Sequence, residues 1–231
     1  MINRYTLTCS REAISERFTA DLSDHYNPRY NAAPSQLLPV LTSDAPKGFS
    51  WFYWGLSPER SRNKSISERI INRKAEEIPA KPAYRKSLMN HRCLIPADGY
   101  YFWKHLGKKT MVPYRVVLTG RPLFGIAGIW EEFETEAGEI HHTFSMITTA
   151  AASVSADQTD RMPLLLTPEE EQLWLHTKSE TELESILSKA AEFSMEQYSV
   201  SPAIEQDTRD VPSMILPTPP ADQFGNLTLF G

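Results

Sequence analysis

The feature that most constrains the fold is a series of short apolar segments, rich in β-branched and aromatic residues, between residues 93 and 149. Gly and Pro separate these segments, and each has the length of a strand. They are Cys93–Ile95, Tyr100–Trp103, Tyr114–Leu118, Leu123–Trp130 and Phe144–Thr149. Leu37–Thr42 and Ser50–Trp54 have the same character. The pattern predicts an α+β fold whose mostly antiparallel sheet forms a partly closed barrel, with a few peripheral helices.

Helix start signals lie on either side of these strands. Ser10 is expected to cap a helix that runs to about Asp21, and Ala83–Asn90 forms a short helix after Pro82. Two later segments have the capping-box pattern, in which a hydroxyl and a Glu three residues on satisfy free N–H groups of the first turn. They are Thr167-Pro168-Glu169-Glu170 and Ser179-Glu180-Thr181-Glu182.

The end of the chain differs in composition from the rest. Four prolines fall within nine residues, at Pro212, Pro217, Pro219 and Pro220. Proline favours extended chain, so we expect one domain over residues 1–211 and a proline-rich tail over residues 212–231 that leaves the body.

Composition excludes several classes of protein. Hydrophobic residues make up 41% of the 231 residues, enough for a core, yet no apolar run approaches the roughly 18 residues of a membrane span. The opening residues have no apolar run behind a basic segment, so we expect no secretory signal. Cys9 and Cys93 are too few for a disulfide framework, and no Cys/His spacing is typical of zinc. We therefore expect a cytoplasmic protein with no metal and no cofactor.

The charges are segregated along the chain. The net charge of −5 argues weakly against nucleic-acid binding. Residues 60–121, however, contain 15 of the 24 Lys and Arg but only four acidic residues, a local net of +11, whereas the remainder carries −16. Such a stretch either forms a positive surface for an anionic partner or is neutralised by ion pairs with the acidic remainder.

Four segments carry a family resemblance, and they occur in the family's order. They are Arg29-Tyr30-Asn31-Ala32-Ala33-Pro34, Trp54-Gly55-Leu56-Ser57-Pro58, Arg92-Cys93-Leu94-Ile95-Pro96-Ala97-Asp98-Gly99-Tyr100-Tyr101 and Asp160-Arg161-Met162-Pro163. Together they resemble the SRAP family of SOS-response-associated peptidases, or abasic-site processing proteins. The resemblance covers most of residues 1–202.

The resemblance implies covalent capture of an abasic site in single-stranded DNA. In the family, a Cys at position 2 becomes the first residue, so that one residue carries both an amine and a thiol. The amine condenses with the ring-opened sugar aldehyde, and the thiol closes onto the imine to form a thiazolidine. Nearby Asn, Glu and His residues orient the sugar and move protons.

This chain departs from the family at most of those positions. The nucleophile position holds Ile2, the active-site Glu is replaced by Phe102, and the His before the last motif is Thr159. Asn72 is the only reacting group that is retained. We therefore expect the chain to be defective in thiazolidine cross-linking, and we leave open whether it acts as an enzyme.

DNA binding is the function that we expect to remain despite these departures. Residues that match or conservatively replace family positions near the DNA path are Arg4, Asn72, Lys74, Arg85, Arg92 and Arg161. Phosphate contacts from such cations give sequence-independent affinity that falls with salt. The alternative for each is an ion pair within the protein. Glu59-Arg60 stands where the family commonly has an aromatic residue, which removes a base-stacking group.

The two cysteines do not replace the missing nucleophile. Cys9 lies seven residues beyond Ile2, so its thiol cannot form a five-membered ring with the terminal amine. Both Cys9 and Cys93 are interpreted mainly as core cysteines. The Met1 amine can still form a reversible Schiff base.

The last residues resemble a partner motif. Asn226-Leu227-Thr228-Leu229-Phe230 resembles the peptide by which bacterial proteins bind the replication sliding clamp, with Asn in place of Gln. The alternative is a terminal strand that anchors the tail onto its own domain.

The sequence supports three hypotheses about function. The first is noncovalent binding of single-stranded or abasic-site DNA, associated with the nucleoid when bound. The second is active abasic-site processing, by a cross-link or a Schiff base through the N-terminal amine. The third is a protein-interaction adaptor with a vestigial DNA groove. Peptidase activity lacks a nucleophile and base in this sequence.

Overall fold

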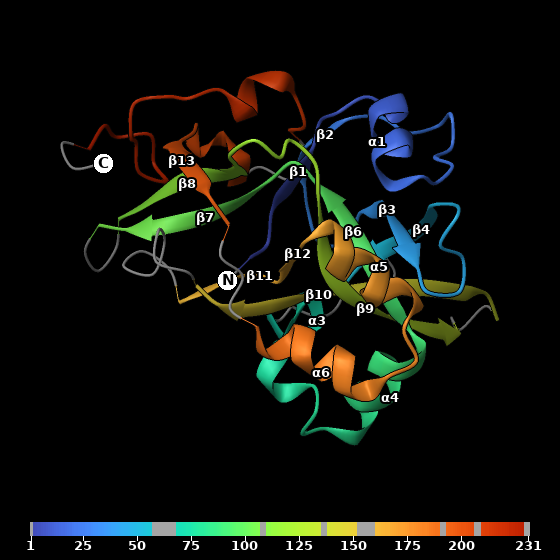
Figure 1. Cartoon of the computed structure of the whole chain (residues 1–231). Helices are drawn as coiled ribbons and strands as arrows, with labels where there is room; N and C mark the ends of the chain where they lie inside the picture. Colours follow the sequence, from blue (N-terminus) through green and yellow to red (C-terminus); the bar gives the residue numbers. More distant parts are fainter. Residues whose placement is uncertain are drawn as a thin grey trace.

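The computed structural model of the chain describes residues 2–56, 68–106, 110–134, 138–151, 160–189, 193–205 and 209–228. Its strands form two sheets, with helices packed around them (Figure 1). Most strand pairs are antiparallel. The predicted α+β class is therefore confirmed.

Five strands of the larger sheet close into a barrel. They are β3 (Leu37–Thr42), β4 (Ser50–Trp54), β6 (Arg92–Ala97), β9 (Phe124–Glu134) and β10 (Ile140–Ala150). Their order is β10-β4-β3-β6-β9, and β9 pairs back onto β10, which closes the ring. Every pair in this ring is antiparallel except β4 with β10. The predicted barrel is present, and it is fully closed rather than partly closed.

A glycine in β9 lets β6 approach closely. A Cβ atom at Gly128 would lie 2.8 Å from the sulfur of Cys93, so the close contact between these strands requires a residue without a side chain. Cys93 is completely buried there. This confirms its interpretation as a core cysteine.

Three short strands extend the barrel. The two-residue β12 (Leu165–Leu166) pairs with β9. β5 (Asn72–Lys74) runs parallel to β10, and β11 (Arg161–Pro163) runs antiparallel to it. Both β5 and β11 pair with Thr148 of β10, so they lie on opposite edges of that strand. β10 therefore brings together two segments that are far apart in the sequence.

The smaller sheet packs against the barrel. Its order is β13 (Met195–Ser199), β8 (Met111–Leu118), β7 (Gly99–His105), β1 (Tyr5–Leu7) and β2 (Arg29–Ala32), and it is antiparallel throughout. The rings of Tyr5 and Trp54 meet edge to face between the sheets, with centroids 5.4 Å apart. Neighbouring residues of β7 face opposite sides: Tyr100 belongs to the main core and Tyr101 to a second one.

Helices cover the outside of the sheets. They are α1 (Arg11–Phe18), α3 (Glu68–Ile71), α4 (Pro82–Asn90), α5 (Pro168–His176) and α6 (Glu180–Ser188). Ser10 caps α1 as predicted, accepting a hydrogen bond from the Ala13 N–H at 3.2 Å. The helix ends at Phe18 instead of near Asp21, because Thr19 takes a left-handed conformation (φ 51°).

The two predicted capping boxes differ. The hydroxyl of Thr167 and the carboxylate of Glu170 satisfy each other's backbone N–H groups, so the first box is complete. Ser179 accepts from the Glu182 N–H at 3.4 Å, but the Glu182 carboxylate accepts from the Thr177 hydroxyl instead of closing the box. The second box is therefore only half formed.

The C-terminal segment packs on the body, where the sequence predicts a departing tail. Figure 1 shows it in orange and red, along β13 and β8. In the 3-10 turn η3 (Pro212–Ile215), Met214 is buried in the second core beside Tyr101. The Thr218 N–H donates to the Ser199 carbonyl at 3.0 Å, and the Met111 N–H donates to the Gln223 side chain at 2.8 Å. Proline content did not reveal these anchors.

Candidate nucleic-acid site

Residue 2 lies against the first residue of β5. The Nδ2 group of Asn72 donates a hydrogen bond of 2.7 Å to the main-chain carbonyl of Ile2. Asn72 is itself buried, and among the described residues its Oδ1 atom has no hydrogen-bond partner. An unsatisfied buried acceptor costs about 1–3 kcal/mol, so Oδ1 is a candidate acceptor for a bound group. The structure thus joins the family's nucleophile position to its retained Asn.

Apolar side chains fill the positions of two missing reacting groups. Ile2 and Phe102 are each only 1% exposed, and both belong to the main core. The Tyr101 N–H donates to the Arg4 carbonyl, and the register of β1 on β7 extends to place Phe102 opposite Asn3. Phe102 also stacks on Tyr114, with centroids 5.5 Å apart. Positions 2 and 102 therefore provide neither a thiol nor a carboxylate. Thr159 and Met1 lie outside the described residues.

Neither cysteine is an activated nucleophile. Burial, together with the nearby Asp98 carboxylate, raises the pKa of the Cys9 thiol to about 11. Complete burial also raises the pKa of Cys93. The reactive form of cysteine is the thiolate, so the raised pKa values keep both side chains mainly protonated at neutral pH.

Two predicted DNA contacts lie on opposite edges of β10, near Thr148. Lys74 ends β5 opposite Thr148, and its side chain is half exposed at 4.0 Å from the Glu77 carboxylate. Arg161 begins β11 on the other edge, and its guanidinium lies across the strand, donating to the Thr148 hydroxyl at 3.2 Å and to both oxygens of Glu76. We call Ile2, Asn72, Lys74, Glu76 and Arg161 the β10 site.

The predicted DNA contact of Arg92 is wrong. Its side chain is completely buried. The guanidinium donates to four carbonyls at the ends of α4 and α5, those of Leu88, Met89, Trp174 and Thr177. Helix C-termini leave carbonyls without partners, and a buried cation satisfies them here. Burial prevents Arg92 from reaching a phosphate, so its role is structural.

The other two predicted cations have different surroundings. Arg4 is 7% exposed, and one guanidinium nitrogen lies 3.5 Å from the Glu205 carbonyl, so it is largely covered by protein. Arg85 is exposed on α4, where its Nε group donates to the Glu180 carboxylate of α6. DNA contact by Arg85 stays a prediction.

Ion pairs neutralise much of the basic stretch in the described residues. Lys81 pairs with Glu77, Arg115 with the buried Asp98 at 3.1 Å, and Arg73 with Glu131 at 3.9 Å. Of these three pairs, only that of Arg73 with Glu131 reaches the acidic remainder, because Glu77 and Asp98 lie within the basic stretch itself. Glu59 and Arg60 lie outside the described residues.

Sequence reasoning left two motif residues without a role. Asp98 accepts hydrogen bonds from the hydroxyls of Thr6 and Thr8 and from Arg115, and so anchors β1. Glu76 accepts hydrogen bonds from Arg161. It lies in the same short segment as Asn72, Asn72-Arg73-Lys74-Ala75-Glu76, which corresponds to the family pattern N-A-R-x-E, and Glu76 matches the Glu of that pattern. That match was the available signal for Glu76.

The candidate clamp motif begins in a turn. Asp222 accepts hydrogen bonds from the N–H groups of Phe224 and Asn226 at 3.0 and 2.8 Å, and from the Asn226 side chain. Phe224 and Leu227 are 78% and 75% exposed. Leu229 and Phe230 lie outside the described residues.

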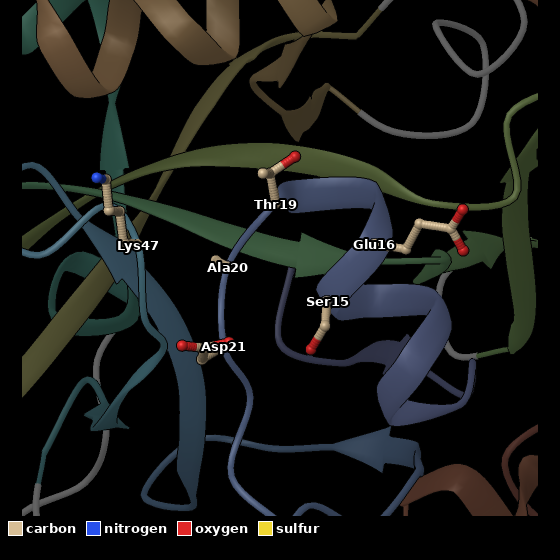
Figure 2. Close-up of a pocket in the computed structure, with 6 residues that line it drawn as sticks. All are labelled: Ser15, Glu16, Thr19, Ala20, Asp21 and Lys47. Carbon is tan, nitrogen blue, oxygen red and sulfur yellow. The ribbon is translucent and has the colours of Figure 1, made fainter.

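A separate hollow lies between α1 and the loop before β4 (Figure 2). It is lined by Ser15, Glu16, Thr19, Ala20, Asp21 and Lys47, none of which belongs to the β10 site. Within the described parts of the chain, no group of three His, Cys, Asp or Glu side chains could hold a metal ion. Nor is any helix in those parts long and apolar enough to span a membrane.

Comparisons with known proteins agree with the motifs. The family model of "SOS response associated peptidase (SRAP)" matches residues 1–207. The chain is 36% identical over 221 residues to "Abasic site processing protein YoqW" of Bacillus subtilis, covering 93% of this chain and 99% of that protein. It is 26% identical over 182 residues to "Abasic site processing protein YedK" of Escherichia coli, covering 76% and 79%. A crystal structure of a protein from Bacteroides thetaiotaomicron matches with a TM-score of 0.78 and 26% identity, covering 93% of this chain and 99% of that one.

Proposed function

Because the chain belongs to the SOS response associated peptidase (SRAP) family, we propose that it binds single-stranded DNA at abasic sites without forming the thiazolidine cross-link. The abasic-site processing named for its relatives supports the DNA partner. The β10 site supports the location, because it holds a retained Asn against residue 2 and places two cations along the same strand, β10.

One observation carries the proposal: the hydrogen bond from Asn72 to the carbonyl of Ile2. It holds an amide beside residue 2 although the side chain there has no nucleophile. The Oδ1 atom of Asn72 is covered by protein in this structure, so it can accept from a sugar hydroxyl or aldehyde hydrate only when the residues over it move aside. The group that orients a sugar is thus present, and the group that attacks it is absent.

The missing step follows from covalent geometry. A thiazolidine needs nitrogen and sulfur on one residue, separated by two carbons. Ile2 supplies no sulfur, and Phe102 supplies no carboxylate for proton transfer. Binding therefore depends on Lys74, Arg161 and Arg85 for phosphate contacts and on Asn72 at the lesion.

A titration tests this function. Fluorescence anisotropy measures binding of two single-stranded oligonucleotides that differ only by one abasic site, at several salt concentrations. We expect salt-dependent binding to both and tighter binding to the abasic strand. Equal affinity for the two oligonucleotides would contradict lesion recognition. Lack of binding to either oligonucleotide would contradict the proposed function. Borohydride trapping of an imine would instead favour a Schiff-base mechanism through the terminal amine.

A second candidate function is recruitment to the replication sliding clamp. The observation that supports it is the exposure of Leu227, a residue of the motif. Leu227 lies a few residues beyond Gln223, whose side chain accepts a hydrogen bond from Met111 of β8. Such tethering would raise the local concentration of a weak DNA binder at replication forks. In a pull-down with the bacterial clamp, Leu227→Ala with Phe230→Ala should lose recovery. Phe224→Ala, outside the motif, should retain it. Unchanged recovery of the first variant would contradict clamp binding, and clamp recovery without DNA binding would favour an adaptor.

A further inference from the structure

We propose that Glu76 occupies the place of a DNA phosphate on Arg161, so that DNA binding exchanges this carboxylate for a phosphate. The inference rests on the proposed DNA-binding function and adds a self-blocking contact within the same site. It makes Glu76 a regulator of affinity rather than a ligand of DNA.

The geometry of the pair supports the exchange. Two guanidinium nitrogens of Arg161 each bond one oxygen of Glu76, with the second contact at 3.1 Å. Carboxylate and phosphate both accept this two-pronged arrangement from arginine. Glu76 therefore uses the donors that a backbone phosphate would use.

Arg161 keeps a second anchor that does not depend on Glu76. Its Nη2 group also donates to the Thr148 carbonyl, and to the Thr148 hydroxyl at 3.2 Å. Thr148 lies within the paired part of β10, between β5 and β11. The guanidinium thus keeps its bonds to Thr148 of β10 when the carboxylate swings away.

Exposure makes the carboxylate the movable partner. The Glu76 side chain is 58% exposed, whereas that of Arg161 is 16% exposed. Because the Glu76 carboxylate already reaches solvent, water can take over its hydrogen bonds when it leaves Arg161. Arg161, helped by Lys74, holds the pKa of Glu76 below its ordinary value, which keeps the competing carboxylate charged.

The neighbouring Glu77 provides a matched comparison. It lies beside Glu76 on the 3-10 turn η1 (Ala75–Glu77) and pairs with Lys74 and Lys81 rather than with Arg161. Glu77→Gln removes the same charge one residue away. It therefore measures the effect on DNA affinity of removing a charge that pairs with Lys74 and Lys81 instead of Arg161.

The test compares Glu76→Gln, Glu77→Gln and the intact chain in binding to abasic single-stranded DNA. We expect Glu76→Gln to bind at least about fivefold more tightly than Glu77→Gln, with a salt slope steeper by about 0.7, as for one additional phosphate contact on single strands. In the Arg161→Gln background, Glu76→Gln should give no such gain. Thermal unfolding confirms that each variant is folded.

The outcomes distinguish this inference from the proposed function. If the intact chain binds DNA but Glu76→Gln binds equally or more weakly, the exchange is wrong while DNA binding stands. An equal gain in Glu77→Gln also overturns the exchange. If neither the intact chain nor Glu76→Gln binds, both proposals fail. Binding by Glu76→Gln alone supports the exchange.

Discussion

The side-chain amide of Asn72 donates a 2.7 Å hydrogen bond to the main-chain carbonyl of Ile2, and so ties the start of β5 to the second residue of the chain. The same amide has a buried oxygen without a partner among the described residues. Ile2 itself is buried in the main core. Positioning and bond formation are therefore separable at this site, and each can be tested alone.

Restoring sulfur at position 2 should restore covalent capture. In Ile2→Cys, removal of Met1 would place an amine and a thiol on one residue beside Asn72. We expect a slow conjugate with abasic single-stranded DNA that survives heat and SDS. Loss of the large side chain costs about 2–4 kcal/mol of stability, so circular dichroism must show folded protein.

Ile2→Ser is the control for this variant, because it loses the same apolar contacts but has no thiol. It should give no conjugate. A folded Ile2→Cys protein that also gives none would show that the Asn72 geometry is insufficient without the groups replaced by Phe102 and Thr159.

Asn72→Ala should reduce lesion recognition more than general DNA binding. Removing one hydrogen-bonding group at the sugar corresponds to about 1–1.5 kcal/mol, or about fivefold to tenfold in the ratio of affinities for abasic and intact strands. Anisotropy titrations measure this ratio. Asn90→Ala, on the exposed side of α4, should leave it unchanged. An unaltered ratio in Asn72→Ala would exclude Asn72 from lesion recognition.

Arg92→Ala should destabilise the fold. The substitution removes the donor of four carbonyls at two helix ends, two of them fully buried, and we expect a loss of about 3 kcal/mol or more in the free energy of unfolding. Urea denaturation measures it. Arg85→Ala, at an exposed position, should leave the midpoint nearly unchanged. A stable Arg92→Ala protein with weakened DNA binding would reverse the structural assignment.

Cys9 should react as an ordinary protonated thiol. Its pKa of about 11 keeps it protonated at pH 7.5, so alkylation of native protein by iodoacetamide should be slow and should accelerate about tenfold per pH unit towards alkaline pH. Peptide mapping separates Cys9 from Cys93. Cys9→Ser should keep its DNA affinity. Rapid alkylation at neutral pH, accompanied by loss of DNA binding, would identify Cys9 as part of the site.

The sequence predicted what depends on local pattern. Leu37–Thr42 and Ser50–Trp54 are strands with those bounds, because β-forming residues lie between turn residues. The closing pair of the barrel, β9 with β10, and the parallel pair of β4 with β10 follow from long-range packing that no local pattern encodes. Likewise, prolines indicated an extended tail, but the burial of Met214 holds that segment on the body.

For the candidate site too, the sequence predicted what a local motif shows and missed what depends on long-range packing. The motif match located Asn72 and Arg161, and the structure brings both to β10. The sequence shows the motif and the charge of Arg92, and these predict a DNA contact. It does not show that the C-terminal ends of α4 and α5 pack around the Arg92 side chain. The pairing of Glu76 with Arg161 joins segments 85 residues apart, and no local pattern predicts such a contact.

The most direct test is incubation of the intact chain with abasic single-stranded DNA, with one half of the sample run on a native gel and the other half heated in SDS and run on a denaturing gel. We expect a shifted complex on the native gel and free DNA on the denaturing gel. A conjugate that forms without reductant and persists through heat and SDS would contradict the loss of covalent capture.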